Sequence, residues 1–401
     1  MIKRTLYINK LLLFKDKKLI KIISGVRRAG KSTLFALYQE DLLNKGVKQE
    51  QIININFEDP QYRNFLSWET LYDYINSILL PNEQNYIFFD EIQLVKDFQK
   101  AVDGLFLKKN VDIYLTGSNA HLQTGQWATL LTGRYIEIHV FPLSFKEYVS
   151  SFNNKNDILF KYQNYVETTS FPQQLEFKTE NPIEKKIYIR DYLSSIYNTI
   201  ILKDIVQANK IQNITHLESI ILFIASNIGS LTSINNIAKT MNANRRKIST
   251  HTIENYIKAL CDSYILYKAT RYDIKGKKFL QTLDKYYFVD AGLKYFILGD
   301  KNIDCGHILE NVVYLELLRR NYKVYIGKNN NTEVDFVVEG INGTQYYQVC
   351  NTVANKDILE RELKPLNSIN DHNPKFLLTK DFTTANYNGI KQINVFQWLL
   401  E

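Results

Sequence analysis

The stretch Gly25-Val26-Arg27-Arg28-Ala29-Gly30-Lys31-Ser32 decides the fold of this 401-residue chain. It matches the pattern GxxxxGK[ST] at every fixed position, and it lies between a β-type run and a helical pattern, as that pattern requires. In such a loop the backbone N–H groups wrap a phosphate, and the N-terminus of the next helix directs partial positive charge at it. The stretch therefore predicts a binding site for a nucleotide triphosphate, and an ordinary glycine turn is the weaker alternative.

Two side chains of this loop have individual expected roles. Lys31 is expected to reach the β- and γ-phosphate oxygens, and Ser32 is expected to hold Mg²⁺. The complete set that we expect to contact ATP is Gly25, Val26, Arg27, Arg28, Ala29, Gly30, Lys31, Ser32 and Thr33.

Around the loop, the first 150 residues alternate short apolar runs with longer helical patterns. This alternation predicts an α/β fold with a parallel sheet covered by helices, whose ligands bind at the carboxyl ends of the strands. The expected strands are Leu19–Ser24, Ile52–Phe57, Tyr86–Phe89, Val111–Thr116 and Tyr135–Val140.

The third run delivers two adjacent carboxylates, Asp90 and Glu91, to its carboxyl end. About sixty residues after a phosphate-binding loop, such a pair is typical of a nucleotide hydrolase. Asp90 is expected to bind Mg²⁺, and Glu91 is expected to polarise the attacking water as a general base. The pair favours hydrolysis over a kinase-like use of the phosphate site.

The segment after the fourth run offers further catalytic candidates. Ser118 and Asn119, with Thr116, could sense or orient the γ-phosphate, but they could equally cap the helix that is expected to begin at Ala120. Arg134, which follows Gly133, could reach the nucleotide of a neighbouring subunit or could be an ordinary surface residue.

These motifs, in this order, resemble a family of prokaryotic AAA+ ATPases. The resemblance rests on the loop GxRRxGK[ST] at Gly25–Ser32, on FDEIQ at Phe89–Gln93, on TGS at Thr116–Ser118, on LxGR at Leu131–Arg134 and on PLSFxE at Pro142–Glu147. It implies ATP and Mg²⁺ as cofactors and a homo-oligomer whose subunits share Arg134. It also implies a second half that looks like a winged helix joined to a restriction-nuclease-like fold.

The resemblance and the local patterns together predict four domains. We expect a P-loop AAA+ core over 1–150, a helical lid or connector over 151–215, a winged helix over 216–295 and an α/β restriction-nuclease-like domain over 296–401. In the third, helices are expected at Leu217–Asn227, Ser233–Met241 and Ser249–Cys261, and strands at Tyr264–Tyr272 and Lys278–Asp290.

Composition limits the classes of protein that remain. Hydrophobic residues make up 45% and charged residues 23%, which excludes a disordered, collagenous or disulfide-scaffold protein. Cys261, Cys305 and Cys350 form no CxxC pair, which argues against a zinc ribbon or a redox motif. No run approaches the roughly 18 apolar residues of a membrane span. We therefore expect a soluble, cytoplasmic protein with no membrane partner.

The formal net charge of +8 is concentrated in two stretches. Residues 1–40 hold ten basic and two acidic residues, and residues 239–278 hold ten basic and three acidic ones. The second stretch predicts a DNA-binding surface, although protein contacts or simple solvation would also fit. The candidate DNA contacts are Arg245, Arg246, Lys247, Lys258, Arg271, Lys275 and Lys277.

The last hundred residues suggest a nuclease that has lost its catalytic set. Glu310 and Asp335 fit the first two acidic positions of a restriction-type site, but Gln348-Val349-Cys350 stands where [DE]xK is expected. A lysine moved to Lys356 is an alternative. We expect a retained structural or binding fold, and we expect His307 to cap or pack.

The function predicted from the sequence is that of an ATP-hydrolysing AAA+ switch that binds DNA through its winged helix. Two alternatives stay open, namely an ATP-gated DNA nuclease and a nucleotide-dependent module that binds proteins without DNA.

Overall fold

The computed structural model describes residues 2–117, 131, 133–152, 157–177, 179, 181–243, 247–299 and 305–401. Contacts between Cα atoms divide the chain into two units, which are described separately. The first comprises Met1–Pro142, Asn198–Lys210 and Asp262–Tyr264, and the second comprises Leu143–Tyr197, Ile211–Cys261 and Ile265–Glu401.

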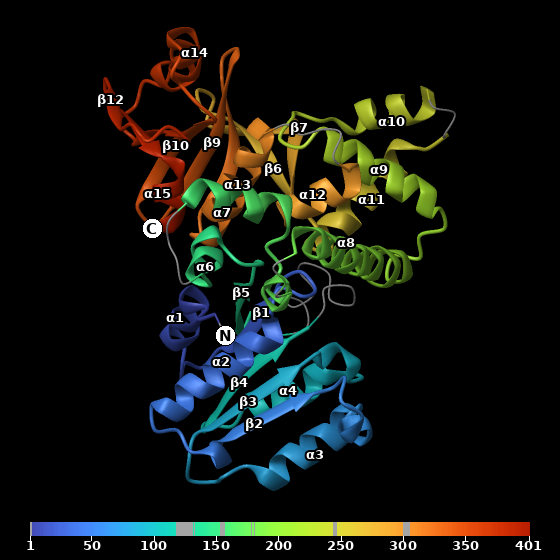
Figure 1. Ribbon diagram of the computed structural model, residues 1–401. Helices are drawn as coiled ribbons and strands as arrows, with labels where there is room; N and C mark the ends of the chain where they lie inside the picture. Colours follow the sequence, from blue (N-terminus) through green and yellow to red (C-terminus); the bar gives the residue numbers. More distant parts are fainter. Residues whose placement is uncertain are drawn as a thin grey trace. The chain divides into compact units, whose positions relative to one another are not determined.

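The first unit is built on a five-stranded sheet in which every pairing is parallel (Figure 1). The strand order is β2-β3-β4-β1-β5, so that β1 lies between β4 and β5 and not beside β2, the next strand along the chain. All five predicted runs are confirmed as strands. Their bounds are β1 (Ile20–Ser24), β2 (Ile52–Asn56), β3 (Asn85–Asp90), β4 (Val111–Thr116) and β5 (Tyr135–His139).

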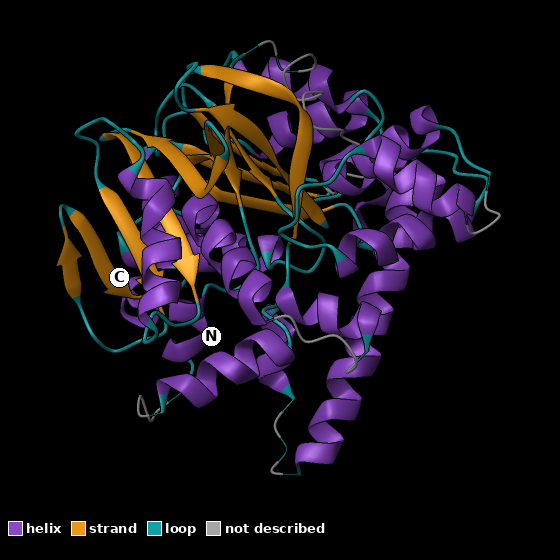
Figure 2. Cartoon of the chain, turned by 90° about the horizontal axis from the view of Figure 1, so that it is seen from above, coloured by secondary structure: helices purple, strands orange, loops and turns teal. Residues whose placement is uncertain are grey.

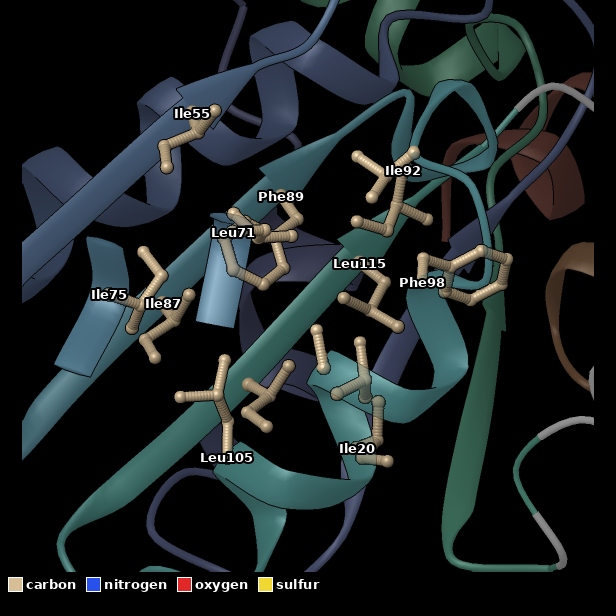
Figure 3. Close-up of a cluster of buried hydrophobic side chains, with 14 of the residues drawn as sticks. Ile20, Ile55, Leu71, Ile75, Ile87, Phe89, Ile92, Phe98, Leu105 and Leu115 are labelled. Atoms are coloured by element: carbon tan, nitrogen blue, oxygen red, sulfur yellow. The ribbon is translucent and has the colours of Figure 1, made fainter. Parts of the chain in front are cut away.

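Helices cover both faces of this sheet. Successive residues of a strand point to opposite faces, and every residue of β3 is buried, so both faces need a covering layer. Phe88 of β3 packs edge-on against Phe35, with ring centroids 5.1 Å apart, on the side of α2 (Lys31–Asn44). Phe89, the next residue, belongs to the core that α3 (Trp68–Ile78) and α4 (Phe98–Phe106) close (Figure 3). Figure 3 shows Leu71 and Leu105 of these helices meeting the strand residues.

Shorter elements complete the first unit. They are α1 (Thr5–Leu13) at the start of the chain and three 3-10 helices, η1 (Gln49–Gln51), η2 (Pro60–Phe65) and η3 (Ile92–Leu94).

The predicted connector is helical, but it is shared between the two units. It contains α7 (Ile158–Glu167), η4 (Pro172–Glu176) and α8 (Pro182–Asn198), and it is preceded by α6 (Phe145–Ser150). The helix then continues as a π-helix, η5 (Thr199–Gln207), which belongs to the first unit. No helix among the described residues is long and apolar enough to cross a membrane.

The second unit contains the predicted three helices and hairpin, followed by the remaining strands. The helices α9 (Ile214–Ser226), α10 (Ile234–Ala243) and α11 (Thr250–Asp262) precede β6 (Leu266–Asp273) and β7 (Lys278–Phe288). The later elements are α12 (Ala291–Leu298), α13 (Cys305–Arg319), β8 (Lys323–Asn329), β9 (Thr332–Gly340), β10 (Gly343–Cys350), α14 (Lys356–Asn367), β11 (Lys375–Thr379), β12 (Ala385–Tyr387), β13 (Ile390–Asn394) and α15 (Val395–Leu400).

The hairpin is not separate from the strands that follow it, which differs from the predicted boundary at residue 295. β6 pairs in parallel with β8, so that one sheet of eight strands runs in the order β12-β13-β11-β10-β9-β8-β6-β7. Figure 1 labels β6, β7, β9, β10 and β12 of this sheet, and Figure 2 draws the strands in orange. Phe336 of β9 packs against Tyr314 of α13 on one face of the sheet. Its neighbour Val337 belongs to the core under α14 on the other face.

Candidate nucleotide-binding and hydrolysis site

The predicted phosphate-binding loop joins β1 to α2, and its backbone needs glycine at two positions. Gly25 has a φ of 136°, and a Cβ there would lie 2.1 Å from the carbonyl oxygen of Val140. Gly30 has a φ of 94° and caps α2, which begins at Lys31. Any larger side chain would be strained at both positions. The loop therefore has the strand-to-helix geometry that presents N–H groups to a phosphate.

Lys31 lies inside the loop that it is expected to serve. Its ammonium donates to the carbonyl oxygens of Gly25 at 3.0 Å and Val26 at 3.3 Å, and the residue is 7% exposed. Burial lowers the pKa of Lys31, against the opposing effect of the carboxylates of Glu91 and Asp90. A phosphate at this loop would supply the negative charge that favours the protonated amine.

The other loop side chains differ in how they can contribute. Val26 and Ala29 are buried, so only their backbone groups can face a ligand, whereas Arg28 is exposed. Arg27 forms two hydrogen bonds with Asp204 of η5, at 3.0 and 3.1 Å. Asp204 was not among the predicted site residues.

At the carboxyl end of β3, the Asp90 carboxylate lies next to two hydroxyl groups. The Thr116 hydroxyl of β4 donates to Oδ1 of Asp90, and Ser32 also forms a side-chain hydrogen bond with this carboxylate. Burial raises the pKa of Asp90, and these hydrogen bonds partly offset that effect. The predicted metal pair, Ser32 and Asp90, is thus brought together by the fold.

Glu91 follows in a left-handed backbone conformation with a φ of 55°. Its N–H donates to the Thr116 hydroxyl oxygen at 3.1 Å, and its Oε2 accepts from Nε2 of Gln93 at 2.5 Å. The Thr116 hydroxyl group therefore donates a hydrogen bond to the Asp90 carboxylate and accepts one from the backbone N–H of Glu91. Such a departure from ordinary backbone geometry is tolerated where the surroundings hold it in place.

This donor set fits a magnesium ion, because Mg²⁺ prefers oxygen ligands from one or two carboxylates together with phosphate and water. Ser32 and Asp90 would hold the ion, which would neutralise charge on the phosphate oxygens.

Arg4, from the start of the chain, forms a hydrogen bond with the backbone of the phosphate-binding loop. Its guanidinium donates to the carbonyl oxygens of Ala29 at 3.0 Å and Phe141 at 2.7 Å, and the residue is 4% exposed. The same guanidinium lies 4.7 Å from the ring centroid of Tyr7. The start of the chain thus fixes the loop and the segment after β5 to one another.

Arg134 directly precedes β5, and its carbonyl accepts from the N–H of Ile20 at the start of β1. In a parallel sheet this is the edge opposite the loop that follows β1. The guanidinium is near Asp103, at 3.6 Å, and the side chain is 46% exposed. Arg134 therefore lies at the sheet edge away from the phosphate-binding loop of its own chain. Ser118 and Asn119 lie outside the described residues.

Comparisons with known proteins show the family of the chain. An uncharacterized protein of Haemophilus influenzae is 38% identical over 407 residues, covering 100% of this chain and 99% of that protein. An uncharacterized protein of Methanocaldococcus jannaschii is 33% identical over 362 residues, covering 86% and 77%. The chain belongs to the family of these two proteins. Residues 17–149 match the AAA domain family, and residues 152–304 match a domain of unknown function.

The chain also resembles a solved structure. A Walker-type ATPase of Pyrococcus abyssi superposes with a TM-score of 0.50 at 16% identity, over 74% of this chain and 96% of that chain. At this identity the likeness establishes the fold. Together with the AAA match, it identifies the first unit as a P-loop domain of the AAA+ type.

The predicted DNA contacts fall in two places in the second unit. Lys247 precedes α11 and Lys258 lies on it, and both are exposed. Arg271 is on β6, and Lys275 and Lys277 lie in the turn between β6 and β7, where both lysines are exposed. Arg245 and Arg246 lie outside the described residues.

One of the two acidic residues of the predicted nuclease-like site, Glu310, is ion-paired with a buried lysine. The ammonium of Lys285 on β7 lies 2.9 Å from Glu310 and 2.8 Å from Glu333, and its side chain is 4% exposed. Burial lowers the pKa of Lys285, but the neighbouring carboxylates outweigh this and raise it. In the part of the chain that the structure describes, no group of three metal-ligating side chains could hold a metal ion.

Asp335 and Gln348 also have structural partners. Asp335 accepts from the N–H of Val349 at 2.8 Å, and Gln348 donates to Glu362 at 3.0 Å. Lys356 is 3.9 Å from Glu360 on its own helix, and its side chain is 86% exposed. These contacts do not place Lys356 among the acidic residues.

Proposed function

We propose that this chain is an ATP-hydrolysing switch whose AAA domain binds ATP with Mg²⁺ and whose second unit binds DNA. The observation that supports hydrolysis is the hydrogen-bonded set of Ser32, Asp90, Thr116 and Glu91 beside the phosphate-binding loop. A domain that only bound nucleotide would not need an oriented second carboxylate.

In this proposal each group acts at a defined atom. Backbone N–H groups of residues 25–32 and the Nζ atom of Lys31 bind the phosphate oxygens. The carboxylate of Glu91, held through Oε2 by Gln93, accepts a proton from the attacking water. Arg134 of one subunit contacts the nucleotide of the next, which makes turnover dependent on a homo-oligomer.

Two substitutions test the ATPase assignment. Lys31→Ala is expected to abolish nucleotide binding, and Glu91→Gln is expected to keep binding while reducing turnover by about 100-fold or more. Binding is measured with a fluorescent ATP analogue and turnover by phosphate release. Glu40→Gln, on the same helix as Lys31, is the control and should leave both unchanged. Normal hydrolysis by either test variant would refute the assignment.

The proposed DNA contact rests on the arrangement of α9, α10, α11 and the β6–β7 hairpin. The segment between α9 and α10 also pairs with the hairpin, since the N–H of Thr232 donates to the carbonyl of Asp284 at 2.8 Å. Three helices and a hairpin joined in this way are typical of a winged helix. The exposed Lys258 lies on its third helix and the exposed Lys247 lies just before that helix, where both could contact phosphates.

Charge reversal tests the DNA proposal. Substitution of Arg245, Arg246 and Lys247 by Glu should weaken duplex binding by about tenfold or more and should reduce its salt dependence. The matched control reverses Lys356, Lys364 and Lys391, which are exposed elsewhere in the same unit. An absence of DNA binding by the wild-type protein at low salt would favour the protein-interaction alternative.

A further inference from the structure

Three aromatic side chains gather where the β6–β7 hairpin meets β8. The ring centroids of Tyr272 and Phe279 are 5.4 Å apart, those of Phe279 and Tyr325 are 5.1 Å apart, and those of Tyr272 and Tyr325 are 6.0 Å apart. We call Tyr272, Phe279 and Tyr325 the aromatic patch. All three belong to the second unit and come from three adjacent strands of its sheet.

Two rings of the aromatic patch pack against the core, and the third is largely exposed to solvent. Tyr272 and Tyr325 are partly buried and pack against the core that includes Val334 and Val337. Phe279 is 59% exposed, which is unusual for a phenylalanine within a strand. Two fixed rings thus hold a third ring with much of its surface accessible. An aromatic surface of this kind is suited to stacking against a planar ligand.

The β6–β7 hairpin, which carries Tyr272 and Phe279, is strongly basic. Residues 271–279 contain Arg271, Lys275, Lys277 and Lys278 against Asp273 alone, a net charge of +3. Lys275, Lys277 and Lys278 are exposed, and Asp273 accepts from the N–H of Gly276 at 3.0 Å within the turn. The charge of this strip therefore favours a polyanion, while its exposed ring favours an aromatic group on that polyanion.

We propose that the aromatic patch stacks an unpaired base of single-stranded nucleic acid, while the hairpin lysines bind the adjoining phosphates. The proposal rests on the proposed nucleic-acid function and specifies the strand form that this surface takes. In a duplex the bases are already stacked, so that an exposed ring gains little from it, whereas a single strand offers both base faces and phosphates. A neutral protein partner would leave the lysines without counter-charges.

Substitutions at Phe279 separate stacking from simple apolar contact. Phe279→Ala and Phe279→Leu should each weaken binding of a fluorescein-labelled oligothymidylate of about 20 nucleotides by roughly 5- to 150-fold, while Phe279→Trp should retain it. The leucine variant keeps the apolar bulk and loses only the aromatic face. Phe382→Ala is the control, because Phe382 is 63% exposed elsewhere in the second unit. A matched oligouridylate tells RNA from DNA, and thermal unfolding checks that each variant is folded.

The possible outcomes separate this proposal from the wider one. Equal oligothymidylate affinity of the wild type, Phe279→Ala and Phe382→Ala would overturn the stacking role. Retention of affinity by Phe279→Leu would overturn it as well, because an apolar surface would then suffice. Duplex binding without single-strand binding would overturn the stacking proposal and leave the winged-helix proposal standing. No binding of either form at about 50 mM salt would overturn both.

Discussion

Arg27 and Asp204 are joined by two parallel hydrogen bonds, from Nε to Oδ2 at 3.0 Å and from Nη2 to Oδ1 at 3.1 Å, across 177 residues of sequence. Arg27 belongs to the phosphate-binding loop, and Asp204 lies on the π-helix η5. Burial lowers the pKa of Arg27, but the bonds to Asp204 outweigh it, and the net shift is upward. The part of the connector that belongs to the first unit is thereby fixed to the nucleotide site of that unit.

This pair should be energetically coupled. Arg27→Gln and Asp204→Asn should each lower the free energy of unfolding by about 1–3 kcal/mol, because each leaves a largely desolvated partner unpaired. The double variant should cost less than the sum, with a coupling of about 0.5–3 kcal/mol. Denaturant unfolding of the four proteins measures it. Lys45 and Asp41, 2.7 Å apart but more exposed, provide the comparison pair, and an equally small coupling for both pairs would contradict the expectation.

Thr116 should matter more for turnover than for nucleotide affinity. Its hydroxyl joins Asp90 to the backbone of Glu91, so Thr116→Val removes both hydrogen bonds with little change in volume. We expect the turnover number to fall by about 10- to 100-fold, the range found when partners of metal ligands are replaced. Thr116→Ser keeps the hydroxyl and should restore most activity. If valine and serine gave the same rate, the hydroxyl would have no role in turnover.

Lys285 should be essential to the stability of the second unit. Lys285→Met would leave the carboxylates of Glu310 and Glu333 without their buried cation, at a cost of about 3–5 kcal/mol. Lys285→Arg keeps the charge and should be milder. Lys268→Met is the control, because Lys268 pairs with Asp284 but its side chain is 45% exposed. Thermal unfolding of the three variants ranks them, and equal losses for both methionine variants would contradict this account.

Because Lys285 already pairs with Glu310, we expect no metal-dependent cleavage of DNA by this unit. Supercoiled plasmid incubated with the protein, ATP and Mg²⁺ or Mn²⁺ should remain uncut, and nicking that depends on Glu310 or Asp335 would contradict this expectation. The sequence already indicated the loss through Gln348 and Cys350. It did not indicate that Lys285 of β7, outside the predicted nuclease-like domain, forms an ion pair with Glu310.

The features that could be predicted from the sequence are those that depend on residues close together in the chain. The five strands of the first sheet, the glycine loop and the meeting of Ser32 with Asp90 all follow from short motifs and from the rule that ligands bind at the carboxyl ends of parallel strands. The contacts of Asp204 with Arg27 and of Arg4 with Ala29 could not be predicted, because they join distant segments that have no common motif. The pairing of β6 with β8 is of the same kind, and it is why the predicted boundary between the last two domains cuts through a continuous sheet.

Asp290 should give the second unit a measurable pH dependence. It is fully buried and accepts hydrogen bonds from the backbone N–H groups of Ser170 and Leu293 and from the hydroxyls of Ser170 and Thr169. Burial nevertheless outweighs these bonds and raises its pKa above the ordinary 3.8. Between the unfolded and folded pKa values the native state therefore binds more protons than the unfolded chain, so this residue makes the unfolding free energy fall as pH rises through that interval.

Asp290→Asn removes this titration and should reveal it by difference. The variant should be less stable by about 1–3 kcal/mol, because the NH₂ group of the asparagine would face the N–H and hydroxyl donors of Ser170 and leave them without an acceptor. The stability gap between wild type and variant should be widest near pH 4 and should narrow as pH rises, since only the wild type loses stability from this group. Denaturant unfolding at several pH values from about 4 to 7 measures the gap, and exposed Asp73→Asn provides the background. A gap that widens with rising pH would mean that the hydrogen bonds outweigh burial and that the native pKa of Asp290 is lowered.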